Sequence, residues 1–344
     1  MNLRRAIFTI LGLLAVVAAS VLGLTGLSQA QNLVPRLSFQ IMTGSTAGTY
    51  FPVGQAIAGI VSNPPGTDSC AAPNLCGPKG LVVSAQTSAG SVANILAVNA
   101  GYAESGLAQS DVVADAVAGA GPFRRYGPQT HIRIVAALFP EQVHLVASTK
   151  SGIASVRDLR GKRVSLGAAQ SGTQVTAKAI LAAWHVPERG LKQTTQTADM
   201  DALALQKGTL DAFFFFGGAP VPIVDDLMAS GRAHLVPVDG PNAKRLASRS
   251  PYLEAMTIPA GTYHGSGAVP TLGSRALWIV KDSVPNAIVY GMLKALFSPN
   301  NRAALQAGPL VLRGLRPDSA GRSLPSPIDA GALRFYREQG VATR

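Results

Sequence analysis

The stretch QIMTGSTAGTYFPVG, residues 40–54, decides the fold class. Its apolar start predicts a short strand, which ends in small polar residues and leads into a helix. The apolar positions of that helix fall on one face: Val53, Ile57, Ile60 and Val61. A strand that passes through small polar residues into a helix is typical of a parallel sheet with helical crossovers.

The same order recurs along the chain. LVVSAQ (81–86) leads into TSAGSVANILAVNAG (87–101), and KRVSLGA (162–168) leads into AQSGTQVTAKAILAAWHV (169–186). HIRIVAALF and VHLVAST are expected to be consecutive strands, separated by Pro140 and Glu141. LDAFFFF (210–216) is expected to be a buried strand rather than a stacking surface. The sequence therefore predicts an α/β protein whose ligands bind at the carboxyl ends of its strands.

The N-terminal 30 residues have the composition of a secretory signal peptide. Arg4 and Arg5 precede an apolar run from Ala6, and small residues stand near Ser28 and Ala30. We expect cleavage near Ala30 and a periplasmic location. A retained anchor is the alternative, because the apolar run approaches the ~20 residues that span a bilayer. The remaining chain of more than 300 residues exceeds the usual size of one hydrophobic core, so two lobes are expected.

The charge distribution argues against nucleic acid as a partner. The formal net charge is +12, and removal of Arg4 and Arg5 leaves +10. The basic residues are scattered singly and aromatic residues make up only 6% of the chain, whereas nucleic-acid binding needs a basic stripe or an aromatic platform. A basic surface that attracts an acidic solute or an anionic membrane fits better.

Cys70 and Cys76 lie in a Pro/Gly-rich loop, SNPPGTDSCAAPNLCGPKG. In an exported protein two neighbouring cysteines most often form a disulfide. Zinc would need further ligands, and this loop has no other cysteine and no histidine. We expect a disulfide, no metal and no cofactor.

The junction in residues 40–54 matches neither of two well-known catalytic motifs. Gly44 and Gly48 are four residues apart and no Lys follows, so the stretch is not a phosphate-binding P-loop. It also lacks the G-x-S-x-G spacing of a nucleophile elbow. A helix N-terminus nevertheless favours an anion, and hydroxyl groups add donors. The alternative is that Ser45, Thr46 or Thr49 only caps its own helix.

Four such junctions together point to a binding site. Each carries hydroxyls, amides or backbone N–H groups at the end of a predicted strand: residues 43–50, 87–94, 109–111 and 171–174. Their combination predicts a polar pocket for a small ligand that bears a carboxylate.

Seven segments, in order, resemble one known family: TGSTAGTYFPVG, TSAGSVANILAVNAG, GLAQSDVVADAVAG, FPEQVHLVAS, SVRDLRGKRVSLGAAQSGT, LDAFFFFGGAP and IPAGTYHG. The chain resembles the TAXI-type solute receptors of tripartite ATP-independent periplasmic (TRAP) transporters over residues 37–300. The resemblance implies a two-lobed periplasmic-binding-protein fold of the second structural type, with the ligand between the lobes. The implied boundaries are 37–140 plus 259–344 for the first lobe and 141–258 for the second.

The resemblance also implies ligand-binding residues and partners. The first-lobe set is Ser45, Thr46, Tyr50, Ser88 and Gln109. The second-lobe set is Ser171, Thr173, Gln174 and Gly217, and Tyr263 is expected to close the pocket as a phenol donor. Glu141 and His144 lie at the first crossover, where Glu141 is expected to meet a ligand ammonium and His144 a carboxylate; alternatively they bond each other or the hinge backbone.

The implied ligand is a glutamate-like amino acid or a dicarboxylate, delivered by a monomeric receptor to TRAP membrane permease subunits. The parts of the matched segments that are expected to form the pocket contain no Arg to clamp a carboxylate, although Arg133 or Arg275 could assist. No catalytic residue is expected. Two rival interpretations remain: a periplasmic hydrolase that uses Ser45 or Ser171 with His144, and a sensory protein that presents its ligand to a signalling partner.

Overall fold

The computed structural model describes residues 34–66, 70 and 74–343. Residues 36–344 form one compact unit. The predicted signal peptide lies outside the described residues. None of the helices in the described part of the chain is long and apolar enough to cross a membrane.

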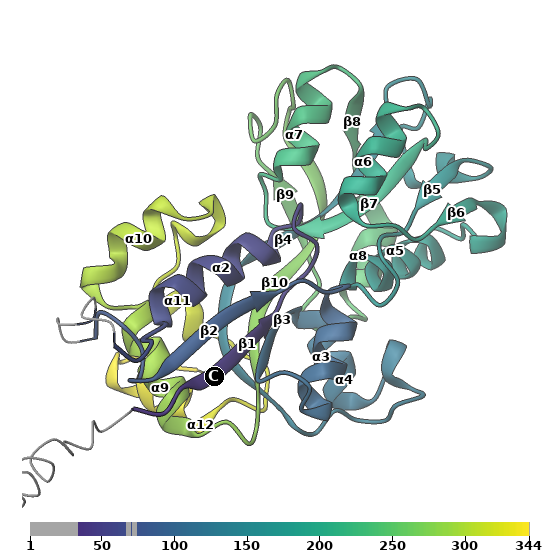
Figure 1. The fold of residues 1–344 in the computed structure, drawn as a ribbon. Coiled ribbons are helices and arrows are strands. Elements are labelled where there is room, and N and C mark those ends of the chain that lie inside the picture. Colours follow the sequence, from purple (N-terminus) through teal and green to yellow (C-terminus); the bar gives the residue numbers. More distant parts are fainter. Residues whose placement is uncertain (1–33, 67–69, 71–73, 344) are drawn as a thin grey trace, which may run out of the picture. The chain divides into compact units, whose positions relative to one another are not determined.

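The first part of the chain has the predicted alternation of strands and helices. The strands are β1 (Leu37–Met42), β2 (Leu81–Gln86) and β3 (Ser105–Gln109), which are parallel in the order β2-β1-β3. The helices that follow them are α2 (Tyr50–Val61), α3 (Ser91–Ala100) and α4 (Ser110–Ala118). In Figure 1, α3 and α4 lie side by side next to β3.

Two long antiparallel strands, β4 (Ile132–Ser148) and β10 (Val269–Lys281), pair with each other in the middle of the sheet. The sequence predicted two strands separated by Pro140 and Glu141, but the structure has one continuous strand. Proline cannot donate a ladder hydrogen bond and is tolerated at irregular positions. Here Pro140 pairs with Arg275, next to a register shift between Ala276 and Leu277.

The middle of the chain repeats the strand-and-helix order. Its strands are β5 (Arg163–Ser165), β6 (Lys192–Thr194), β7 (Ala212–Gly217), β8 (Ala233–Val236) and β9 (Glu254–Ile258). Its helices are α5 (Gly172–Ala183), α6 (Ala198–Gln206), α7 (Pro222–Ala229) and α8 (Gly240–Ala247). The main sheet order is β2-β1-β3-β10-β4-β7-β5-β6, while β8 pairs with β4 and β9 with β10. Phe213 to Phe216 are buried in β7, as predicted.

The C-terminal segment returns to the first half of the sheet. Its helices are α9 (Asn286–Leu296), α10 (Arg302–Ala307), α11 (Pro317–Gly321) and α12 (Ala330–Glu338). Short 3-10 turns are η1 (Gly121–Phe123), η2 (Val156–Leu159), η3 (Glu188–Gly190), η4 (Pro299–Asn301) and η5 (Leu310–Leu312). α9 packs against α2 and α12, and the buried Tyr336 hydroxyl donates to the Val135 carbonyl at 3.0 Å. The last residues of the chain therefore stabilise the first lobe.

Separate hydrophobic cores distinguish the two lobes. One core joins residues 39–139 to residues 276–336 and includes Trp278. Two further clusters hold apolar residues from 143 to 272, including Trp184. Tyr263 and Leu272 belong to these second-lobe clusters, beyond the boundary expected at 258. We therefore propose that the chain changes lobes within β4 and within β10, between Leu272 and Ala276.

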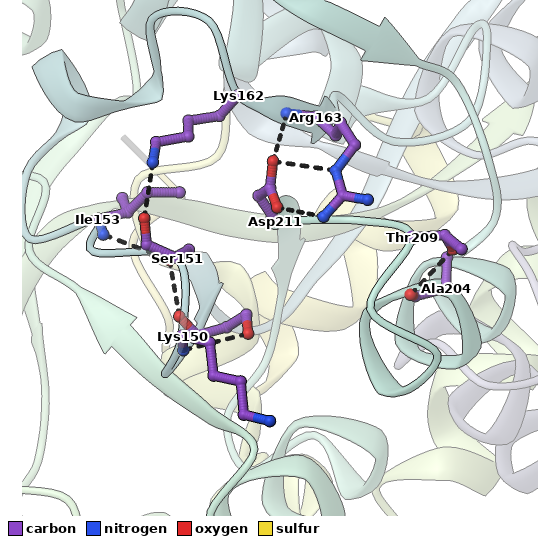
Figure 2. A network of polar contacts seen from close by, with 9 residues as sticks. Lys150, Ser151, Ile153, Lys162, Arg163, Ala204, Thr209 and Asp211 are labelled. Carbon is purple, nitrogen blue, oxygen red and sulfur yellow. Dashed lines mark hydrogen bonds and ion pairs between the residues drawn. The ribbon is translucent and has the colours of Figure 1, made fainter.

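A polar network fixes the local structure of the second lobe around β5 (Figure 2). The Asp211 carboxylate accepts from the backbone N–H of Arg163 at 2.8 Å and from its Nε at 3.1 Å. These hydrogen bonds hold the pKa of Asp211 below its usual value. Lys162, the residue before β5, donates to the Ser151 carbonyl at 2.7 Å. The start of β5 is therefore held by hydrogen bonds to Asp211 and to Ser151.

The predicted disulfide is confirmed. Cys70 and Cys76 are bonded, with their Cα atoms 5.4 Å apart. The bond closes part of the loop between α2 and β2.

Candidate functional site

A cavity of about 80 Å³ lies where the strand-to-helix junctions of the two lobes meet. One water molecule needs ~10–15 Å³ of such space, so the cavity has room for several water-sized groups. Its first-lobe wall contains Gly44, Ser45, Gly48, Thr49, Tyr50, Ser88, Ala89, Gly90, Ser91 and Gln109. Its second-lobe wall contains Gly167, Ala168, Ser171, Gly172, Thr173, Gln196, Thr197, Ala198, Asp201 and Phe214 to Phe216.

Four helices begin at this cavity. Their first residues, Tyr50, Ser91, Gly172 and Ala198, all line it. The first N–H groups of a helix have no partner within the helix, and the positive end of the helix dipole favours negative charge. The cavity therefore suits an anionic group, although the described residues that line it include no Lys, Arg or His.

Tyr50 connects the cavity to a buried acidic pair beneath it. Its hydroxyl donates to Glu141 Oε2 at 2.9 Å, while Glu141 Oε1 has no hydrogen-bond partner among the described residues. Burial raises the pKa of Glu141 well above its usual value and that of Asp111 to about 6. Glu141 does not line the cavity, and the contact that its carboxylate makes is with the Tyr50 hydroxyl.

His144 is held within the second lobe. Its Nδ1 lies 3.0 Å from the Gln142 carbonyl, and its Nε2 lies 2.7 Å from the Tyr263 hydroxyl. The same hydroxyl accepts from the Val221 N–H at 3.0 Å. Burial lowers the pKa of His144 to about 4. A neutral ring that donates from Nδ1 and accepts at Nε2 fits these contacts and leaves neither nitrogen for a ligand.

Several hydroxyls of the cavity wall also serve the protein. Ser88 Oγ donates to Asn94 Oδ1 at 2.6 Å and accepts from Gly90 N–H. Ser171 Oγ caps α5 by accepting from Gln174 N–H at 3.0 Å. Thr173 Oγ1 accepts from Phe216 N–H at 3.1 Å. These side chains therefore shape the wall through contacts within the protein.

The structure brings six of the twelve predicted ligand-binding residues to the cavity. These are Ser45, Tyr50, Ser88, Gln109, Ser171 and Thr173. The other six do not line it: Thr46, Glu141, His144, Gln174, Gly217 and Tyr263. Thr46 is exposed, and Tyr263 is buried against His144.

The two arginines considered as helpers also lie elsewhere. Arg133 lies 3.5 Å from the Asp282 carboxylate, and Arg275 donates to backbone carbonyls of the C-terminal segment. Neither residue lines the cavity.

Sequence reasoning missed Asp201, the one charged side chain among the described residues of the cavity wall. It lies in the first turns of α6 and is 1% exposed. The signal in the sequence was a further strand-to-helix junction, QTADMD (196–201), which has the same position in the fold as the junctions that were recognised.

The two walls touch each other around the cavity. Ala93 N–H of the first lobe donates to the Gln170 carbonyl of the second at 3.2 Å. Thr49 Oγ1 lies 3.5 Å from the Gly218 carbonyl. A Cβ atom on Gly90 would come within 3.4 Å of Ser171. These contacts describe a cavity whose lobes are closed on each other.

Two α/β lobes joined through β4 and β10, with a cavity between them, define the periplasmic-binding-protein fold that the resemblance implied. The chain belongs to the NMT1-like family, whose model matches residues 41–340.

Two solved structures agree with this fold, and a third is similar at a lower TM-score. A periplasmic transporter is 13% identical, with 88% of this chain and 92% of that chain covered and a TM-score of 0.52. A protein from Bordetella bronchiseptica RB50 is 15% identical, with 87% and 88% covered and a TM-score of 0.50. The alkanesulfonate-binding protein SsuA from Xanthomonas axonopodis pv. citri, bound to MOPS, is 14% identical, with 88% and 84% covered and a TM-score of 0.44. At these identities the likeness concerns the fold alone.

Proposed function

We propose that the protein is an extracytoplasmic receptor that binds a small carboxylate-bearing solute, a glutamate-like amino acid or a dicarboxylate. The observation that carries this proposal is the start of four helices at one cavity, at Tyr50, Ser91, Gly172 and Ala198. Such a site recognises a carboxylate through backbone N–H groups and hydroxyls, without an arginine clamp.

Binding is coupled to lobe closure. The cavity wall combines residues of both lobes, so a ligand makes its full set of contacts only in the closed state and shifts the population toward it. We propose that the hinge consists of the part of β4 around Pro140 and the part of β10 around Ser274. These two segments pair with each other where the chain passes between the lobes.

Transfer to a TRAP membrane permease is proposed from the motif resemblance alone. Uptake of a radiolabelled solute by membrane vesicles supplemented with the purified receptor tests this partner. A TRAP permease predicts uptake that an ionophore abolishes and ATP depletion does not. Uptake that requires ATP would contradict the TRAP partner and leave the receptor role intact.

The contacts of His144 favour a receptor over the rival hydrolase. Ser45 and Ser171 line the cavity, whereas His144 lies outside its lining and contacts Tyr263 and the Gln142 carbonyl. A serine nucleophile needs a base within hydrogen-bond reach.

A thermal-shift screen of the mature protein with amino acids and dicarboxylates tests the proposal. A solute present at 100 times its Kd should stabilise the fold by ~2.7 kcal/mol. Each solute that binds is then incubated with the protein and recovered for NMR. Binding with full recovery of the solute supports a receptor, and conversion of the solute would contradict it.

A further inference from the structure

Two polar side chains in the cavity have no partner. Asp201, from α6 of the second lobe, is 1% exposed, and neither carboxylate oxygen makes a hydrogen bond of normal geometry with the described residues, although the Ser165 hydroxyl is near enough to lower its pKa. Gln109, from the end of β3 in the first lobe, is 2% exposed, and both its Oε1 and its Nε2 are likewise without partners there. Both side chains line the cavity.

Leaving such groups unpaired is costly. A buried polar group without a hydrogen bond costs on the order of 1–3 kcal/mol in proteins, and an ionised carboxylate costs more. Buried polar groups are therefore nearly always satisfied by protein, water or ligand. Because Asp201 and Gln109 belong to opposite lobes, a ligand that satisfies both also holds the lobes together.

The atoms that lack partners specify the chemistry of that ligand. An ionised carboxylate only accepts hydrogen bonds, and the Gln109 carbonyl adds a third acceptor. An ammonium group carries three donors and a positive charge, so it can satisfy these acceptors. A second carboxylate on the ligand would instead be repelled by the Asp201 carboxylate. The anionic end of the same ligand is left for the helix N-termini.

We infer that Asp201, assisted by Gln109, binds the ammonium group of the solute, so that the site selects a zwitterionic amino acid over a dicarboxylate. This inference rests on the proposed function, because it assigns the second end of a ligand whose first end is the carboxylate. Asp201 is then the residue that determines specificity, and neither Glu141 nor His144 has this role.

Pairs of probes that differ only in the amino group test the inference. Isothermal titration compares L-glutamate with glutarate, L-alanine with propionate and L-leucine with 4-methylpentanoate. The expected result is that at least one amino acid binds at least 100-fold more tightly than its partner without the amino group. We also expect Asp201→Asn to weaken the binding of that amino acid at least 10-fold.

Asp199→Asn is the matched control, because Asp199 is an exposed carboxylate on the same helix and does not line the cavity. At pH 8, where Asp201 is mostly ionised with or without the charge of Asp199, it should leave the affinity nearly unchanged. If Asp201→Asn does not fold, the paired titrations on the wild type still decide the question. Equal or tighter binding of the analogue that lacks the amino group would overturn the inference and leave the carboxylate receptor standing. Failure of all six probes to bind would contradict the proposed function, and the inference with it.

Discussion

Gly172 of the second lobe lies directly against Gln109 of the first. A Cβ atom on Gly172 would come 1.4 Å from Gln109 Oε1 and 2.7 Å from Ser91 Oγ. The absence of a side chain at the start of α5 therefore allows the two walls of the cavity to meet. The same closeness places the N-terminus of α5 at the cavity.

Gly172→Ala should hold the lobes apart. We expect a larger radius of gyration by small-angle X-ray scattering and a weaker affinity for whichever amino acid or dicarboxylate gives the largest thermal shift. Gly59→Ala is the control, because Gly59 lies within α2 with no atom within 4 Å of a Cβ there. That change should raise stability by up to ~1 kcal/mol through helix propensity and leave binding unchanged. An unchanged affinity in Gly172→Ala would contradict closure at this contact.

Tyr50→Phe should weaken ligand binding while the protein remains folded. The substitution removes the hydroxyl that donates to Glu141 at 2.9 Å, and it raises the pKa of Glu141 further because that hydrogen bond opposes the effect of burial. A loss of ~1 kcal/mol in the free energy of unfolding is expected.

The matched control is Tyr290→Phe, which removes a phenol-to-carboxylate bond to Glu338 on the surface, 2.7 Å long. Calorimetric titration of both variants with the same solute separates the two roles of the Tyr50 hydroxyl. Equal affinities in the two variants would show that it does not contribute to binding.

Acid should destabilise the protein through His144. Its folded pKa of about 4 lies below the unfolded value near 6.5, so the native state binds fewer protons than the unfolded state between these values. The contribution of His144 to the free energy of unfolding is complete above pH ~6.5 and decreases by about 3 kcal/mol as the pH falls to about 4. Urea unfolding across this pH range should show that His144→Gln loses less unfolding free energy than the wild type.

Acidic groups titrate in the same range, so wild type and variant are compared at each pH. The same substitution at the exposed His264 is the control. Parallel stability curves for the wild type and His144→Gln would contradict a buried neutral imidazole.

Affinity for an amino acid should rise with pH through about 7. Burial raises the pKa of Asp201 to about 7, with a smaller contribution from Asp199 on the same helix and an opposing one from the Ser165 hydroxyl. Helix α7, which packs against α6, carries Asp225 and Asp226, and β7 carries no ionisable side chain.

An ammonium group binds the ionised form of Asp201, so each pH unit below 7 costs up to ~1.4 kcal/mol of binding free energy. Titrations of L-glutamate between pH 5 and 8 should show this dependence in the wild type and lose it in Asp201→Asn. A wild-type affinity that does not change over this range would contradict the involvement of Asp201.

The sequence predicted the architecture because hydrophobic periodicity and small polar junctions are local properties. Helix α2 and strand β7 illustrate this, because their patterns of apolar residues can be recognised without knowing their tertiary contacts. Pro140 led to the prediction of two strands in place of the single strand β4. Whether a proline is tolerated within a strand depends on how that strand pairs with its neighbour, here β10, and the sequence does not reveal this register.

The binding site was only partly predictable. The Gly/Ser/Thr junctions identified Ser45 and Ser171, but the direction of a side chain depends on its tertiary contacts. Glu141 and His144 were expected either to meet a ligand or to bond each other or the hinge backbone; Glu141 bonds Tyr50, and His144 bonds Tyr263 and the Gln142 carbonyl. Asp201 was missed because an acidic residue in the first turns of a helix is common for reasons of local electrostatics alone.

Native mass spectrometry of the protein purified from periplasm tests the central claim most directly. The account predicts a population whose mass exceeds that of the mature chain by one small solute. On denaturation this solute should be released intact and should carry a carboxylate. Release of a solute without a carboxylate, or of a reaction product in its place, would contradict the account.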